Sequence, residues 1–277
     1  MLKQRIITAL VLLAILLPAM FYPASAPFEL VTVALLAAGG WEWARLNGCA
    51  SNVSLFIGLA LGAFLLGFAL LGGVSSQWPW VWSVVGVAWV LLAVVMLRRG
   101  VDGWTQWPRM LRLWLGIALL ACAWLALVQA RQMGLGFLLS VLTLVWMADV
   151  AAYAGGKAFG KRKLAPSLSP GKSWEGALSG ALGVLLLAGA WIWADRQGWT
   201  DGPSVFTHVW AHGPLVALFA TLGLSAMSVS GDLIESLVKR SAGMKDSSQL
   251  LPGHGGILDR VDALLPILPL AMMLAQL

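Results

Sequence analysis

The sequence has few charged residues for its length, and this shortage excludes most soluble folds. Only 11% of its 277 residues are charged, whereas 60% are hydrophobic, and the mean hydropathy is +0.84. Apolar runs of about 20 residues recur along the chain, which a soluble core of this size does not need. The composition therefore predicts an all-α, polytopic transmembrane protein.

Cysteine and histidine are also scarce, which argues against two kinds of site. The two cysteines, Cys49 and Cys122, are predicted in an inner loop and in the middle of a span, so neither a disulfide nor a thiolate metal site is indicated. Three histidines are too few to favour a histidine-based zinc site. No fixed-period repeat or long linker interrupts the chain, so residues 1–277 are interpreted as a single membrane domain.

Nine apolar segments are candidate membrane spans. They cover approximately residues 6–22, 28–46, 54–74, 79–97, 113–130, 134–153, 174–194, 214–231 and 257–277. An N-terminus in the cytoplasm would put every lysine and arginine except Arg131 and Arg196 on the inner side, in agreement with the positive-inside rule. We therefore expect an inner N-terminus, an outer C-terminus and a multi-pass protein suited to a bacterial cell inner membrane.

The net charge of +6 follows from these basic inner loops, which suit anionic lipid head groups and indicate no nucleic-acid partner. Most of the 16 tryptophans lie near span ends, as is typical of interfacial belts. The first apolar run resembles a secretory signal that ends at Ala24-Ser25-Ala26. Pro27 directly after that point argues against cleavage and favours a first span.

Polar residues are concentrated in the second half of the chain. Residues 1–130 contain few of them, Glu42 being an exception, and are predicted to serve packing, dimerisation or lipid contact. Residues 131–277 are predicted to carry the chemistry. Residues 230–262 alone hold five of the 12 acids, and ionisable groups in a bilayer cost about 2.5–3.5 kcal/mol each and are functional by default.

This segment joins a charged helical stripe to a glycine-rich turn. The spacing of three and four predicts one stripe that contains Asp232, Glu235, Ser236, Lys239 and Arg240. A solvated helix face tied by Glu235 and Lys239 would explain these pairs, but it would not explain the turn at residues 252–256 and the second acidic pair, Asp259 and Asp262. Amides at such a helix start can hold phosphate, and the carboxylates can hold Mg²⁺, so we favour a functional site.

The histidine of this turn, His254, has three interpretations. It lies between Gly253 and Gly255, and it could be a general acid or base, a phosphate donor or a turn residue. The last two are preferred.

Two further polar segments are predicted on the same inner face. The first runs from Asp149, inside an apolar span, through Lys157 to residues 161–163. Residues 155–161 fit the spacing of a P-loop, but Arg162 replaces its Ser/Thr and no strand precedes it, so a P-loop is rejected. A basic loop near phosphates and a positive-inside anchor both remain open.

The second segment covers residues 169–176 and opens a helix. Ser173 is placed to cap that helix, and Glu175 suits its positive end. Lys172 would then be free for an anionic ligand.

Together these residues resemble the signature of the phosphatidate cytidylyltransferase family. The matching positions are Ser236, Lys239-Arg240, Lys245-Asp246, Pro252-Gly253-His254-Gly255-Gly256 and Asp259-Arg260-x-Asp262. About 27 residues match, and the segments around Asp149 and Lys172 are also similar to that family. The first half of the chain matches only as a region of several spans.

The resemblance implies transfer of CMP from CTP to phosphatidate, with Mg²⁺ required and a second cation left open. It also implies contact with membrane lipids and a homodimer. Asp232 and Asp259 are expected to hold metal, with Asp149, Asp246 and Asp262 as further ligands or supporting groups. The expected catalytic residues are Lys239, Arg240, Lys245, Asp246, His254 and Arg260, and the expected substrate-binding residues are Lys157, Lys172, Ser173, Ser236, Gly255 and Gly256.

Two other classes of membrane protein are alternatives. A secondary transporter would spread its acids near the midplane of related halves, whereas here they gather towards one face. A CDP-alcohol phosphotransferase would carry the signature D-G-x-x-A-R, which is absent. Asp259 and Asp262 are also expected to lie below the membrane surface, where a lipid could enter sideways.

Overall fold

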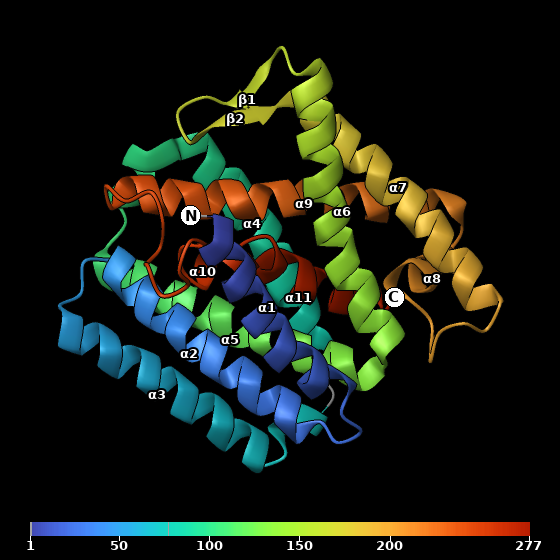
Figure 1. Ribbon diagram of the computed structural model, residues 1–277, viewed down its shortest axis with the longest axis horizontal. Coiled ribbons are helices and arrows are strands. Elements are labelled where there is room, and N and C mark those ends of the chain that lie inside the picture. The colour runs from blue at the N-terminus through green and yellow to red at the C-terminus, as the bar shows by residue number, and fades with distance from the viewer. Residues whose placement is uncertain (1, 77) are drawn as a thin grey trace.

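The computed structural model describes residues 2–76 and 78–277, and these residues form a helical bundle with one short hairpin (Figure 1). The elements are α1 (Leu2–Phe21), α2 (Ala26–Leu46), α3 (Ser51–Leu70), η1 (Gly73–Ser75), α4 (Pro79–Thr105), α5 (Arg109–Met133), α6 (Leu135–Phe159), β1 (Lys163–Ala165), β2 (Ser169–Ser173), α7 (Trp174–Arg196), α8 (Val205–Trp210), α9 (Pro214–Ser241), α10 (Leu258–Val261) and α11 (Leu264–Leu274). The prediction of an all-α polytopic membrane protein is confirmed.

Among the described residues, seven helices are long and apolar enough to cross a membrane: α1, α3, α4, α5, α6, α7 and α9. Helix α2 has a similar length, but Glu29, Glu42 and Arg45 lower its hydropathy. The predicted count of nine spans and the predicted orientation stay predictions.

The last predicted span, residues 257–277, is not one continuous helix. The chain forms α10, turns at Asp262 and Ala263, and continues as α11, which has 11 residues. At 1.5 Å per residue α11 is about 16 Å long, roughly half of a hydrocarbon core of about 30 Å. All residues from Pro266 to Met272 are buried, and α11 packs against α4, α5 and α9. This apolar segment therefore belongs to the interior of the bundle.

The N-terminal and C-terminal regions pack together around α9. This helix crosses the bundle in Figure 1 and contacts α4 from the first half of the chain and α6, α7 and α11 from the second. Helices α6 and α7 lie side by side, and strands β1 and β2 connect them as an antiparallel hairpin that pairs Lys163 with Ser173. Lys172 of the hairpin contacts Asp232, so the hairpin lies beside the C-terminal half of α9.

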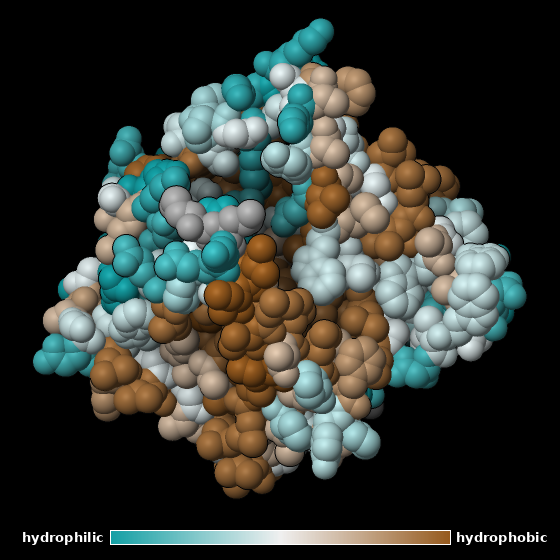
Figure 2. Space-filling view, viewed as in Figure 1, coloured by the Kyte–Doolittle hydropathy of each residue, from teal (hydrophilic) through white to brown (hydrophobic). Residues whose placement is uncertain are grey.

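The surface matches a membrane protein with one polar end. In Figure 2, hydrophilic side chains gather over the hairpin and the upper left of this face, whereas hydrophobic side chains cover its lower centre. The predicted tryptophan belts stay a prediction, and the tryptophans differ in exposure. Trp80 and Trp193 are exposed, but Trp82, Trp104 and Trp124 are buried and fill the core of the bundle.

Candidate active site

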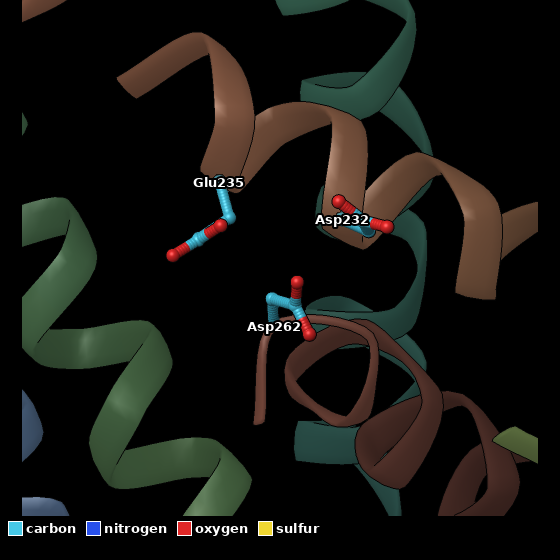
Figure 3. A group of neighbouring side chains, drawn as sticks. All are labelled: Asp232, Glu235 and Asp262. Carbon is cyan, nitrogen blue, oxygen red and sulfur yellow. The ribbon is translucent and has the colours of Figure 1, made fainter. Parts of the chain in front are cut away.

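Three carboxylates meet where α9 approaches the C-terminal segment. Asp232 and Glu235 are three residues apart on α9, so they share one face of the helix. Asp262 projects towards them from the end of α10, and one oxygen of each side chain lies within 4.8 Å of the others (Figure 3). We call Asp232, Glu235 and Asp262 the acid cluster.

Gly231 permits this close approach. A Cβ atom at this position would lie 2.6 Å from the backbone oxygen of Asp262 and 2.9 Å from Cγ of Pro266. Any side chain would therefore push α9 away from the C-terminal segment. The glycine that precedes Asp232 sets the spacing of the acid cluster.

Glu235 is the most enclosed member of the acid cluster. Its residue is 8% exposed, and the Nζ atom of Lys239, one turn along α9, forms an ion pair with it. This pair was expected under the alternative of a solvated helix face, over which a functional site was favoured. Because Glu235 is almost fully enclosed, the pair belongs to the interior of the bundle and not to a solvated helix face.

Lys239 also binds Asp259, which fixes the start of α10. The Nζ atom of Lys239 lies 2.6 Å from Oδ1 of Asp259, and Oδ2 accepts hydrogen bonds from the backbone N–H groups of Ser247 and Gly256, both at 2.8 Å. Burial alone would raise the pKa of Asp259, but these donors outweigh it and lower the pKa to about 2. Asp259 is therefore a charged carboxylate, and each of its two oxygens already accepts hydrogen bonds from groups of the protein.

A pocket of about 440 Å³ lies beside the acid cluster, between α6, the hairpin, α7 and α9. We call it the hairpin pocket. Five predicted site residues line it: Asp149, Lys157, Lys172, Ser173 and Asp232. The three polar segments of the sequence thus meet at one place, as predicted.

Lys172 connects the hairpin pocket to the acid cluster. Its Nζ atom lies 2.5 Å from Oδ2 of Asp232, so a cation of the hairpin contacts one member of the acid cluster. Ser236, one turn after Asp232, has its hydroxyl 3.4 Å from Oδ1 of the same carboxylate. Asp232 is consequently shared by the pocket and the cluster.

The N-terminus of α7 is capped as the sequence indicated. The Ser173 hydroxyl accepts a hydrogen bond from the backbone N–H of Gly176 at 3.1 Å. The Glu175 carboxylate accepts hydrogen bonds from the N–H groups of Lys161 and Arg162, which closes the hairpin onto α7. Ser173 is therefore occupied by capping, although it also lines the pocket.

Other predicted residues are neither members of the acid cluster nor part of the lining of the hairpin pocket. Lys245 and Asp246 line a second pocket of about 540 Å³ together with Trp41 and Arg45 from α2. Arg240 donates to the backbone oxygen of Met244 at 3.2 Å. Arg260 is exposed on α10.

The turn at residues 252–256 is closed by its own backbone. The N–H of Leu251 donates to the oxygen of Gly255, and the N–H of His254 donates to the oxygen of Leu251, both at 2.8 Å. The Nδ1 atom of His254 is buried and has no hydrogen-bond partner within the described residues. These contacts agree with the interpretation of His254 as a turn residue.

The amides predicted to hold phosphate are already occupied by carboxylates. The N–H of Gly256 binds Asp259, and the N–H groups of Ile257 and Leu258 bind Glu42. A helix start does bind an anion here, but the anion is a side chain of α2. These three amides therefore have no free donor for a phosphate in this arrangement.

Sequence reasoning missed two acids of the site. Glu235 was placed on the charged stripe but not among the expected metal ligands, yet it belongs to the acid cluster. Glu42 was noted only as a polar exception in an apolar region, and it contacts the segment that leads to Asp259. The available signal was the cost of an acid inside an apolar helix.

The chain is similar in sequence to proteins of one family over almost its whole length. A model of the cytidylyltransferase family matches residues 3–277. The Pseudomonas aeruginosa protein named phosphatidate cytidylyltransferase is 41% identical over 272 residues, which cover 97% of this chain and 95% of that protein. The proteins of the same name from Haemophilus influenzae and Brucella suis are 36% and 35% identical, over 97% and 95% of this chain and 96% and 89% of theirs.

Proposed function

The chain belongs to the cytidylyltransferase family, and we infer that it is an enzyme that transfers CMP from CTP to phosphatidate. The products are CDP-diacylglycerol, an intermediate of phospholipid biosynthesis, and pyrophosphate. In this reaction an oxygen of the lipid phosphate forms a bond to the α-phosphorus of CTP, and the bond to the bridging oxygen of pyrophosphate breaks. The resemblance of residues 236–262 to this family is confirmed by the match over the whole chain.

The observation that carries this proposal is the contact between a carboxylate cluster and a pocket lined by cations. Two anions must approach each other in the reaction, and their repulsion has to be offset by positive charge. Lys157 and Lys172 line the hairpin pocket, and Asp232 lies at its boundary with the acid cluster. The attacking lipid phosphate is already anionic, so the site needs charge neutralisation more than a general base.

The acid cluster fits Mg²⁺. Asp232, Glu235 and Asp262 offer carboxylate oxygens within 4.8 Å of one another, and Mg²⁺ prefers oxygen ligands and bridges substrate phosphates. Bound there, the ion would stabilise the negative charge that develops on the triphosphate. A second cation at this site stays a prediction.

The other acids have different places in the proposal. Asp149 lines the hairpin pocket together with Asp232, which suits a supporting role next to the metal ligands. Asp259 holds Lys239 and two backbone N–H groups, which favours a structural role over metal ligation. Asp246 lies in the second pocket with Lys245, so a direct role for either stays a prediction.

The cations around the site neutralise charge in two ways. Lys239 binds both Glu235 and Asp259, so it fixes the acid cluster relative to the start of α10. Lys157 and Lys172 border open space and are placed to contact the triphosphate or the lipid phosphate. Arg240 and Arg260 are exposed, and their roles towards either substrate stay predictions.

The membrane supplies one substrate and the cytoplasm the other. The apolar helices make this a multi-pass membrane protein, and its relatives are bacterial, so we assign it to the cell inner membrane with the site at the cytoplasmic face. Phosphatidate then reaches the acid cluster from the bilayer and CTP from the polar end. A homodimer stays a prediction.

The test is formation of CDP-diacylglycerol from CTP and phosphatidate by the purified protein in detergent, with and without Mg²⁺. The expected result is turnover that requires both substrates and the metal ion. Consumption of CDP-lipid would instead favour a CDP-alcohol phosphotransferase. Ion-coupled flux in proteoliposomes without CTP turnover would favour a transporter and overturn the proposal.

A further inference from the structure

Glu42 is a carboxylate of α2 that is fully enclosed in the bundle. It is 0% exposed, and each of its oxygens accepts two hydrogen bonds. Oε1 accepts from the hydroxyl of Ser248 at 2.6 Å and from the N–H of Ile257 at 2.9 Å. Oε2 accepts from the hydroxyl of Ser247 at 3.0 Å and from the N–H of Leu258 at 2.8 Å.

These four donors come from two separate parts of the region between α9 and α10. We call this region the loop 242–257. Ser247 and Ser248 lie near its middle, whereas Ile257 and Leu258 lie where α10 begins. A carboxylate has only acceptor sites, and two oxygens with four donors satisfy them well. Glu42 therefore binds the middle of the loop and the backbone where α10 begins at the same time.

The absence of a side chain at Gly256 leaves room for the carboxylate of Glu42. A Cβ atom at this position would lie 2.2 Å from Oε1 of Glu42 and 2.1 Å from Oγ of Ser247. The second glycine of the Gly255-Gly256 pair is thus required by packing against α2. This contact links a residue of the sequence signature to an acid about 200 positions earlier.

A chain of polar contacts leads from Glu42 to the acid cluster. The hydroxyl of Ser247 lies between two carboxylates, 3.0 Å from Oε2 of Glu42 and 2.9 Å from Oδ2 of Asp259, so they share its one proton. The backbone N–H of Ser247 also donates to Asp259, at 2.8 Å. Asp259 holds Lys239 at 2.6 Å, and Lys239 forms the ion pair with Glu235. Since Glu235 belongs to the acid cluster, a shift of the loop would move its charge partner.

We propose that Glu42 is a positioning residue, which fixes the loop 242–257 and through Asp259 and Lys239 holds the acid cluster in its reactive arrangement. This inference rests on the proposed function for its effect on catalysis. Glu42 does not line the hairpin pocket, where the substrate phosphates are expected. Its loss is therefore expected to reduce kcat more than it raises the KM for CTP.

The substitution Glu42→Gln isolates the role of the carboxylate. It keeps the size of the side chain and replaces one acceptor oxygen with an NH₂ donor group. Whichever way the amide is turned, its NH₂ group faces a backbone N–H, either that of Ile257 or that of Leu258. The two serines can rotate their hydroxyls and accept, but a backbone N–H cannot. One buried donor is left without a partner, which is costly and is expected to release the start of α10.

The experiment compares Glu42→Gln with Glu29→Gln, a matched change on the same helix, in purified full-length protein. Hydrogen exchange measured by mass spectrometry follows the loop 242–257, and turnover is measured with CTP, phosphatidate and Mg²⁺. We expect faster exchange confined to the loop and the start of α10, and a kcat at least about tenfold lower with the KM for CTP changed less than about threefold. Glu29→Gln is expected to match the parent in both.

Ser248→Ala provides a second route, because it removes one donor and leaves the carboxylate and both backbone contacts. It is expected to raise loop exchange and lower kcat less than Glu42→Gln, and the two changes together are expected to be non-additive. If Glu42→Gln does not fold, Ser248→Ala decides alone. Parent-like exchange and kcat in the variant that folds would overturn the inference.

The two proposals fail separately in this design. A folded parent without turnover would overturn the proposed function, while the exchange measurements would still decide whether Glu42 fixes the loop. An active parent whose Glu42→Gln variant keeps full kcat would overturn the positioning role and leave the reaction standing.

Discussion

The Nζ atom of Lys172 on β2 lies 2.5 Å from Oδ2 of Asp232 on α9. This ion pair, between residues 60 positions apart in the sequence, joins the hairpin pocket to the acid cluster. It places a cation next to the carboxylate that belongs to both the hairpin pocket and the acid cluster. The hairpin is therefore part of the site, although it is the only sheet structure among the described residues.

Asp232→Asn is expected to lower kcat/KM by at least about 100-fold, because loss of even a supporting group around a metal typically costs 10–100-fold. Asn keeps the shape but loses the charge that would bind the ion and Lys172. The measurement is the initial rate of CDP-diacylglycerol formation over a range of Mg²⁺ concentrations. Asp102→Asn, a change at an exposed position of α4, is the control. Activity of Asp232→Asn within threefold of the parent would remove Asp232 from the proposal.

Lys172→Met is expected to lower kcat/KM by roughly tenfold or more, because a cation that faces both Asp232 and the hairpin pocket is lost. Met keeps most of the length and apolar surface of the side chain. Separate titrations of CTP and phosphatidate would show which KM rises. Lys163→Met, on the exposed face of β1, should behave as the parent. An equal loss in both variants would indicate a general effect of hairpin charge.

Removal of divalent metal ions is expected to abolish turnover, and Mg²⁺ is expected to restore it. A readout that does not depend on activity is the binding of Mn²⁺, followed by its electron paramagnetic resonance signal. Because Glu235 and Asp262 share the acid cluster with Asp232, Glu235→Gln and Asp262→Asn should each weaken Mn²⁺ binding by about tenfold or more. Unchanged Mn²⁺ binding in both variants would place the metal elsewhere.

Asp259→Asn separates metal ligation from loop attachment. Its carboxylate already holds Lys239 and the N–H groups of Ser247 and Gly256, so the variant should keep its Mn²⁺ affinity within about threefold but lose about 1–3 kcal/mol of stability at pH 7. Thermal unfolding and Mn²⁺ titration in the same detergent would measure both. A tenfold loss of Mn²⁺ affinity would instead support Asp259 as a ligand.

The lowered pKa of Asp259 predicts how the stability of the folded protein depends on pH. Folding lowers the pKa of Asp259 from 3.8 to about 2, so its charged form is favoured in the folded state. Its contribution is complete above about pH 5 and is lost as the pH falls from about 4 towards 2. The thermal unfolding temperature of the parent should fall over this range, and that of Asp259→Asn should fall less steeply. Parallel curves would contradict the assignment.

Much of the site could be predicted from sequence because its residues lie in three short polar segments of an apolar chain. Asp149, Lys172 and Asp232 stand out against their surroundings, and the structure brings all three to one pocket. Glu235 was harder to assign, because a lysine one turn away provides a sufficient explanation for it. Glu42 could not be placed, since nothing local relates α2 to a loop about 200 residues later.

The fold was predicted in outline but not at its C-terminus. Composition alone indicates a membrane bundle, because long apolar helices have few other uses. The same composition cannot tell a helix that faces lipid from one that faces protein on every side. Residues 264–274 are apolar because α11 is buried within the bundle, and the two prolines at 266 and 269 were the available sign that this run was not an ordinary span.

Gly256→Ala tests whether the glycine-rich turn is fixed by packing or by substrate. A single methyl group would overlap Oγ of Ser247 and Oε1 of Glu42, so we expect a loss of about 1–3 kcal/mol of stability and a large loss of kcat even when Mn²⁺ binding is unchanged. Gly223→Ala on α9, where an added Cβ meets nothing within 4 Å, is the matched control and should not destabilise the protein. Gly256→Ala with parent stability but a raised KM for CTP would show that this glycine leaves room for the nucleotide rather than for Glu42.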